Sequence, residues 1–305
     1  GDFRGARRDL DKSLAWDPIY SYDFEYTYDQ KSWAYNQRQL AGRALGEIRR
    51  ALRDLNRAHR YGPRYAWVYS AAGDPKDYAR GVAELDRYLK RSPKDAWGWA
   101  WRGWTLHQAG RDEEALESLT RASRLAPPAA WPRAWKGKVL AALGRDELAA
   151  SALSAALRRD PGYAPAWGWR AESRRRLGDL RGAVSDFTAA VRLDHRAAWA
   201  LAGRGEAKRG LGNLKGSRAD LDRALGILPD YAEALGWRAE TRRLSGRAKD
   251  ALDDANRALK LKPGLVLVYV TRALLKQSLK DYPGQLKDLR RAAKLDPGLF
   301  AEPAR

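Results

Sequence analysis

The chain has 305 residues with no cysteine or methionine, and 58 Lys and Arg against 38 Asp and Glu give it a formal net charge of +20. Without cysteine it can form neither disulfides nor thiolate metal sites, and it contains no apolar run of the roughly 18 residues that a membrane-spanning helix needs. The positive charge fits an acidic polypeptide, a nucleic acid or a membrane surface, and does not choose among them.

Prolines mark a repeat of 34 residues along the chain. The following prolines are 34 residues apart, or a multiple of 34: Pro93, Pro127, Pro161, Pro229, Pro263 and Pro297. His195 stands where the same spacing would put a proline between Pro161 and Pro229. Small residues recur in the same phase, and a glycine lies between the two helices expected in each unit. A fixed period of this length is typical of helical hairpins stacked into an array.

The two ends of the chain are predicted to be incomplete repeats. Residues 1–18 match the second helix of a leading half repeat, with Gly1 at the turn and Pro18 at the end. Residues 300–305 form a tail that is shorter than the polar helix that usually caps such arrays. These ends predict either a piece of a longer protein or an array that neighbouring chains complete.

Residues 19–31 form an insertion that breaks the period. Aromatic residues alternate there with polar and acidic ones, which is typical of an extended strand. The alternating aromatic residues are Tyr20, Tyr22, Phe24, Tyr26 and Tyr28. Three interpretations stay open for this segment: a loop laid on the hairpins, a pseudo-ligand in the groove, or a docking arm for another copy.

Residues 32–299 are predicted to form eight helical hairpins, each with a helix A followed by a helix B. If the recurring proline of each unit is numbered position 32, the units begin at Ser32, Gly62, Ala96, Ala130, Ala164, Ala198, Ala232 and Val266. The recurring order of Trp or Leu, Gly or Ala, Gly, Ala, Leu or Phe, Ala and Pro resembles the tetratricopeptide repeat family. The resemblance covers nearly the whole chain and implies an all-α fold, a right-handed α-solenoid of helix-turn-helix repeats.

Tryptophan is concentrated on the predicted A helices, mainly at positions 2 and 6. These positions are four residues apart and share one helical stripe, which in the resembled family faces the concave groove or the next A helix. The rings therefore either pack on one another or contact a ligand. Together with basic residues at positions 12 and 13, the predicted peptide-binding groove contains Trp97, Trp101, Trp104, His107, Trp131, Trp135, Trp169, Arg175, Arg176, Trp199, Arg209, Trp237 and Arg243.

Two repeated charge patterns are predicted to be structural. Arg at position 7 occurs together with Asp at position 23, which predicts an ion pair within the hairpin: Arg38 with Asp54, Arg170 with Asp186, Arg204 with Asp220, Arg238 with Asp254 and Arg272 with Asp288. Ser118 and Ala152 at position 23 predict that the pair lapses in their units. Glu172, Glu206 and Glu240 precede Arg175, Arg209 and Arg243 by three residues, which predicts pairs on the helix surface.

No nucleophile elbow, metal-ligand spacing or phosphate-binding loop occurs in the sequence, so we expect a protein that is not an enzyme and has no metal or cofactor. We predict a protein interaction scaffold whose groove binds an extended peptide with acidic and aromatic side chains. One alternative is a structural protein that self-associates head to tail through its ends and the 19–31 arm. The other is a polyanion or RNA binder, and nucleic acid is the less favoured partner. The compartment stays open, with a soluble cytoplasmic protein as the default.

Overall fold

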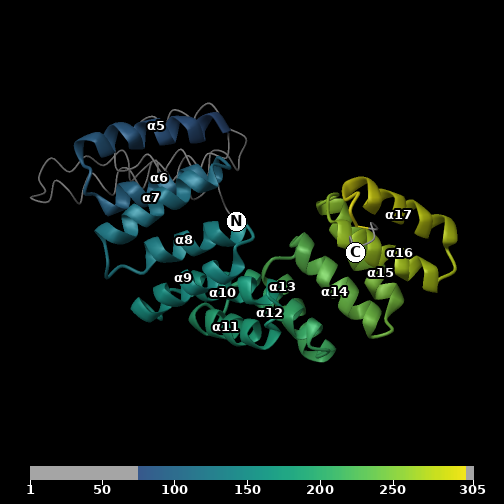
Figure 1. Cartoon of the computed structure of the whole chain (residues 1–305). Helices are drawn as coiled ribbons and strands as arrows, with labels where there is room; N and C mark the ends of the chain where they lie inside the picture. The colour runs from purple at the N-terminus through teal and green to yellow at the C-terminus, as the bar shows by residue number, and fades with distance from the viewer. Residues whose placement is uncertain (1–74, 300–305) are drawn as a thin grey trace, which may run out of the picture. The chain divides into compact units, whose positions relative to one another are not determined.

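The computed structural model describes residues 75–299, and within this range the chain forms α-helices joined by short turns. The chain divides into two compact units, Gly1–Gly144 and Arg145–Arg305, whose helices are labelled in Figure 1. The predicted half repeat 1–18, the 19–31 arm with Tyr20, Tyr22, Phe24, Tyr26 and Tyr28, the repeat from Ser32 and the tail 300–305 lie outside the described residues. The division of the chain at those boundaries stays a prediction.

The helices alternate as first and second members of hairpins. The first unit contains α5 (Pro75–Arg91), α6 (Ala96–Gln108), α7 (Asp112–Leu125) and α8 (Trp131–Ala142). The second unit contains α9 (Asp146–Arg159), α10 (Ala164–Arg176), α11 (Leu180–Leu193), α12 (Ala198–Gly210), α13 (Leu214–Ile227), α14 (Ala232–Leu244), α15 (Ala248–Leu261), α16 (Val266–Ser278) and α17 (Tyr282–Leu295). We call the even-numbered helices A helices and the odd-numbered ones B helices. The predicted all-α repeat solenoid is confirmed.

Each hairpin turn is made by a residue in the left-handed region of backbone space. Five of these residues are glycines with φ between 71° and 83°, namely Gly110, Gly144, Gly178, Gly212 and Gly246. Glycine adopts this conformation without a steric penalty, which explains its recurrence at this place. In the last hairpin the same place is taken by Lys280, with φ 61°. The prediction of a turn glycine is thus confirmed for these five turns and is wrong for the last one.

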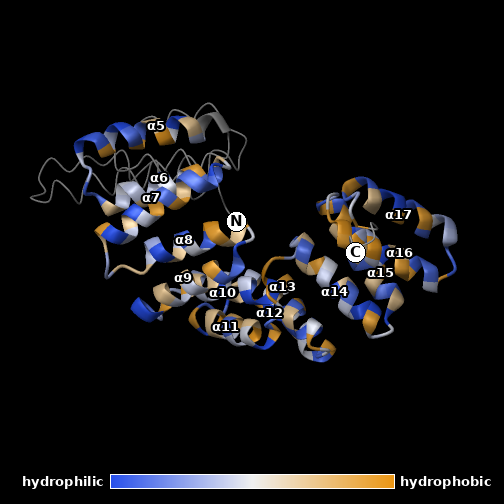
Figure 2. Cartoon of the chain, in the orientation of Figure 1, coloured by the Kyte–Doolittle hydropathy of each residue, from blue (hydrophilic) through white to orange (hydrophobic). Residues whose placement is uncertain are grey.

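The core of each unit consists of small residues and leucines that let helices approach closely. Figure 2 shows how apolar and polar residues alternate along the helices. Ala115, Ala149, Ala183 and Ala251 are fully buried. At Gly103 in α6, a Cβ atom would lie 2.7 Å from the Leu119 side chain and 2.9 Å from the Ala115 carbonyl oxygen of α7. These distances are too short for any side chain, so the glycine sets how closely the two helices pack.

The predicted hairpin ion pairs are present in the second unit and tie more than one hairpin together. Each Arg at position 7 donates through Nε and Nη2 to the buried Asp at position 23, for instance Arg204 to Asp220 at 2.8 and 2.6 Å. Its Nη1 donates to a polar side chain at position 25 of the preceding hairpin, as Arg170 does to Ser154. A second cation at position 11 also reaches the same Asp, as Lys208 does at 2.7 Å from Asp220. The other pairs are Arg170 with Asp186, Arg238 with Asp254 and Arg272 with Asp288.

Candidate functional site

Neighbouring A helices contact one another within each unit, α6 with α8 in the first and α10, α12, α14 and α16 in succession in the second. The A-helix residues predicted to line a groove therefore lie on adjacent helices inside a unit. We call this surface the A-helix face and describe it separately for each unit.

In the first unit, five of the predicted tryptophans come together. Trp97 of α6 stacks on Trp131 of α8 with ring centroids 4.2 Å apart, and Trp101 meets Trp135 edge to face at 4.8 Å. Trp104 lies 5.4 Å from Trp135. Despite this packing, 50% of the Trp97 side chain is exposed. We call these five residues the tryptophan cluster; its rings cover one another in part and still present indole surface.

His107 lies in the last turn of α6, the helix that also carries Trp97, Trp101 and Trp104 of the cluster. Its Nδ1 is 2.6 Å from a carboxylate oxygen of Asp112, the first residue of α7, and both side chains are mostly buried. Its ring is 5.6 Å from that of Trp104. The structure thus gives His107 a partner at the hairpin turn, which orients the ring beside the cluster.

In the second unit the tryptophan series is interrupted at position 6. Gly203 of α12 stands where the first unit has Trp101 and Trp135, and a Cβ atom there would lie 2.4 Å from Cζ of Phe187 in α11. Phe187 is itself unusual, because the two neighbouring hairpins have a leucine at its position, Leu153 and Leu221. The larger phenylalanine ring fills the space that a side chain at position 203 would need.

We therefore expect Gly203→Ala to destabilise the second unit by about 1–3 kcal/mol through overpacking. The change should be tolerated in a Phe187→Leu background, where the ring is replaced by the leucine found in the two neighbouring hairpins. Urea denaturation of the two single variants and the double variant measures this coupling. Equal costs for Gly203→Ala in both backgrounds would show that Phe187 does not exclude a side chain there.

The remaining tryptophans of the second unit are spread along its helices. Trp169 and Trp237 each meet a tyrosine that caps the same helix, Tyr163 at 6.3 Å and Tyr231 at 6.4 Å. Trp199 extends over Gly168 of the preceding A helix, at a place where no side chain would fit, and is 41% exposed. The second unit thus has single rings at intervals rather than a cluster.

Carboxylate and guanidinium groups alternate across α10, α12 and α14. Arg175, Arg209 and Arg243 each hold the Glu three residues earlier through Nε and Nη2, at 2.8 to 2.9 Å. The next A helix continues the series, because Thr271 of α16 donates to Glu240 at 3.0 Å. Arg176 is shared between Glu172 and Asp146. We call this set the Glu–Arg series.

The side chains of the Glu–Arg series are partly buried. Their charges therefore interact more strongly than they would in the exposed helix-surface pairs that the sequence predicts. Burial by itself raises the pKa of Glu240, but hydrogen bonds from Arg243 and Thr271 outweigh it and hold that pKa below its ordinary value. The pKa of Glu172 is lowered in the same way by Arg175 and Arg176. Both groups are therefore ionised near neutral pH, and the arginines beside them are already neutralised.

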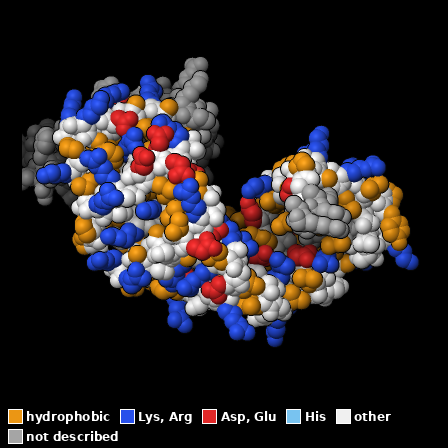
Figure 3. Space-filling view, in the orientation of Figure 1, with side chains coloured by type: hydrophobic (Ala, Val, Ile, Leu, Met, Phe, Trp, Pro, Cys, Tyr) orange, Lys and Arg blue, Asp and Glu red, His pale blue; other side chains and the backbone are white. Residues whose placement is uncertain are grey.

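A pocket of about 370 Å³ opens on the A-helix face between α14 and α16. Trp237, Val270 and Leu274 provide apolar walls, while Glu206, Arg209 and Glu240 bring the Glu–Arg series to its edge. Leu267 lies at the rim and is 70% exposed. Figure 3 shows acidic side chains at the surface over α14. The pocket joins an apolar floor to alternating donors and acceptors, a combination suited to a peptide.

The residues of α16 were not predicted from the sequence as part of the site. Position 6 is Thr271 in that hairpin rather than tryptophan, so the aromatic series gave no signal there. The apolar run Val266–Val270 at the start of the helix was a usable signal, because exposed apolar residues on an A helix need a cover.

The fold and the stacked A helices define a helical repeat solenoid. The family model described as "Tetratricopeptide repeat" matches residues 70–130, 170–231 and 202–266, together just over half of the sequence. The chain belongs to the tetratricopeptide repeat family. Proteins of this family mediate protein–protein interactions, and the fold is typically a non-catalytic scaffold. Among curated proteins, none matches the sequence.

Solved structures share the fold at low sequence identity. The chain is similar to one in the crystal structure of the APC/C hetero-tetramer Cut9–Hcn1, with a TM-score of 0.72 and 15% identity over 97% of this chain, and it spans 57% of that chain. The structure of PilF from Pseudomonas aeruginosa has a TM-score of 0.59 and 14% identity; the match covers 68% of this chain and 95% of PilF. A tetratricopeptide repeat protein from Parabacteroides merdae has a TM-score of 0.54 and 18% identity; the match covers 88% of this chain and 94% of that protein. At these identities the likeness shows the fold alone.

The helices described between residues 75 and 299 include none that is long and apolar enough to cross a membrane.

Proposed function

We propose that this protein is an interaction scaffold whose A-helix face binds an extended peptide segment of a partner protein. The observation that carries the proposal is the pocket between α14 and α16, where exposed apolar side chains lie beside the Glu–Arg series. The tryptophan cluster offers an exposed indole surface in the first unit. Both features lie on the A-helix face, the surface that the sequence predicts to line a groove.

The apolar part of the pocket would bind the side chains of such a peptide. Leu267 and Leu274 are both exposed although they are large and apolar, and Val270 and Trp237 continue the same surface inward. Covering this surface removes apolar area from water, at about 25 cal/mol per Å². An aliphatic or aromatic peptide side chain would supply that cover.

The Glu–Arg series would bind the peptide backbone. Each arginine uses Nε and Nη2 for its glutamate, so Nη1 takes no part in that pairing. The series therefore presents N–H donors and carboxylate acceptors in alternation, and an extended backbone needs both. Neighbouring helices pack roughly 8–10 Å apart, about the length of three residues of extended chain. One contact per repeat would thus engage every third residue.

The pairing also affects the charge expected of this ligand. The sequence places Arg175, Arg209 and Arg243 in a groove predicted to bind an acidic peptide, although it also predicts a glutamate partner for each. In the second unit each of them is matched by a glutamate at bonding distance, so the A-helix face there carries balanced charge. We accordingly propose an apolar peptide with exposed backbone groups for this pocket, and place the acidic specificity elsewhere in the chain.

The test is the binding of peptides blocked at both ends, selected from a random nonapeptide library and measured by fluorescence anisotropy with the full chain. We expect Leu267→Asp to weaken binding at least about tenfold, because it introduces a charge at the apolar rim. Leu286→Asp on α17 is the matched control, since Leu286 is 48% exposed and lies outside the pocket. It should leave binding unchanged.

Other outcomes would contradict the proposal. Equal affinities of the two variants would show that the selected peptides bind away from the pocket. A steep fall of affinity with salt for single-stranded RNA, together with no peptide binding, would instead favour the polyanion alternative. Peptide selection that fails while the chain forms long oligomers in light scattering would favour head-to-tail assembly.

A further inference from the structure

The four hairpins that begin with α10, α12, α14 and α16 share one internal charge arrangement. In each, an Arg at position 7 is held on its Nε and Nη2 atoms by a buried Asp at position 23, as in Arg272 with Asp288 at 2.8 and 2.6 Å. A cation at position 11, such as Lys276, binds the same carboxylate. The arginine charge is thereby satisfied inside the repeat.

The hairpin of α6 and α7 keeps the arginine and loses the carboxylate. Arg102 occupies position 7, but Ser118 takes the place of the aspartate and buried Leu106 takes the place of the second cation. Nε of Arg102 donates to Asp86 of α5 at 2.6 Å, and Nη1 donates to Ser118 Oγ at 2.6 Å. Nη2 takes no part in either bond, and the Asp86 side chain is 45% exposed. Arg102 thus lacks the buried bidentate carboxylate of the other four.

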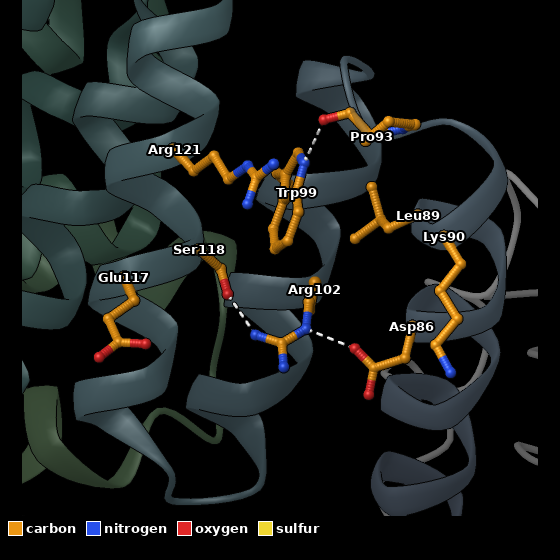
Figure 4. A pocket seen from close by; sticks show the side chains of 9 residues that line it. All are labelled: Asp86, Leu89, Lys90, Pro93, Trp99, Arg102, Glu117, Ser118 and Arg121. Atoms are coloured by element: carbon orange, nitrogen blue, oxygen red, sulfur yellow. Dashed lines mark hydrogen bonds and ion pairs between the residues drawn. The ribbon is translucent and has the colours of Figure 1, made fainter.

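A cavity of about 620 Å³ opens beside this guanidinium. Figure 4 shows α6 at its floor, with Trp99 and Arg102, and the walls formed by α5 and α7. Lys90 lines one wall and Arg121 the other. The Arg121 guanidinium lies over the Trp99 ring, 4.2 Å from its centroid, and the indole Nε1 donates to the Pro93 carbonyl at 2.9 Å. The aromatic floor is therefore fixed in place.

We propose that this cavity binds a side-chain carboxylate of an acidic partner peptide, which takes the role that the position 23 aspartate has in the other hairpins. Charge complementarity supports it. Three cations, Lys90, Arg102 and Arg121, line the cavity against two carboxylates, Asp86 and Glu117. Arginine binds planar carboxylates through paired hydrogen bonds. Trp99 and Arg121 provide a flat surface for the residue next to the acid.

This site is separate from the A-helix pocket of the second unit and does not depend on it. It lies where the B helices α5 and α7 flank α6, in the first unit. It also gives a location for the acidic peptide specificity that we predict from the sequence. A partner with one apolar and one acidic segment would use both sites.

Binding of the blocked peptide acetyl-AEAEAEA-amide to the full chain, measured by anisotropy at fixed ionic strength, tests this assignment. Ser118→Asp places the carboxylate of the other hairpins beside Arg102. It should weaken binding roughly tenfold or more without lowering the urea midpoint. Ser118→Asn has the same shape without the charge and should change binding less than about threefold. Asp86→Asn removes the competing carboxylate and should tighten binding.

Four results would overturn the assignment. The first is equal weakening by Ser118→Asp and Ser118→Asn, which would mean that only space matters. The second is equal affinity for acetyl-AQAQAQA-amide, which has no carboxylate. The third is displacement of the acidic peptide by inorganic phosphate at equal concentration, which would make the cavity a general anion site. A urea midpoint lowered by Ser118→Asp would also count against it, because the carboxylate should satisfy Arg102.

Discussion

Asp220→Ala is expected to destabilise the second unit by about 3–5 kcal/mol, the largest effect of any single substitution considered for this chain. Asp220 is 3% exposed and accepts hydrogen bonds from Arg204 and Lys208. Removal of its carboxylate leaves the partly buried Arg204 and Lys208 without the anion that they bind. Because Arg204 also bonds Thr188 of the preceding hairpin, the damage should extend across two repeats. Urea denaturation followed by circular dichroism measures the loss.

The matched control lies two residues away. Asp222 also binds an arginine, Arg238 at 2.8 Å, but its side chain is 47% exposed. Asp222→Ala should cost less than about 1 kcal/mol, as exposed ion pairs do. If the two variants lost equal stability, the buried aspartates would not be what ties the hairpins together.

Acidification should remove stability through the same buried groups. Hydrogen bonds from Arg204 and Lys208 outweigh the opposing effect of burial and hold the pKa of Asp220 below its ordinary value; Arg272 and Lys276 do the same for Asp288. A carboxylate whose pKa is lower in the folded state stabilises the fold fully above its unfolded pKa of about 4. That contribution is lost as the pH falls through the folded pKa, because the unfolded chain binds the proton first.

The urea midpoint is therefore expected to be nearly constant from about pH 8 to pH 5 and to fall steeply below about pH 4. In the Asp220→Ala variant the acid-induced fall should be smaller, since one of the responsible carboxylates is gone. A wild-type midpoint that stayed level down to about pH 3 would contradict the role given to these pairs. Glu172 and Glu240, whose pKa values are also lowered, add to the effect.

The fold could be predicted from the sequence because the repeat depends on local constraints that recur. Glycine at each turn follows from a positive φ, and Gly103 follows from the close approach of α7. The pairing of Arg204 with Asp220 was also predictable, because the two residue types recur together at a fixed separation. These features need only the two helices of one hairpin.

The candidate site was harder to predict because it depends on contacts between hairpins. The sequence placed tryptophans at positions 2 and 6 but did not show that the ring of Phe187 requires Gly203 in the next hairpin. It predicted the pair of Glu206 with Arg209, which the structure contains, but not the extension of that series to Thr271 of α16. The interhelical bond of Thr271 to Glu240 carries no periodic signal, because it occurs where the tryptophan at position 6 is replaced.

Hydrogen–deuterium exchange of the full chain with a selected peptide is the decisive test of the proposal that the A-helix face of the second unit binds an extended peptide. Bound peptide should slow exchange in α14, α16 and the turn 262–265 before α16, because these segments line the pocket. The protection should disappear in Leu267→Asp and persist in Leu286→Asp. Protection confined to the B helices α15 and α17 would contradict binding at this face.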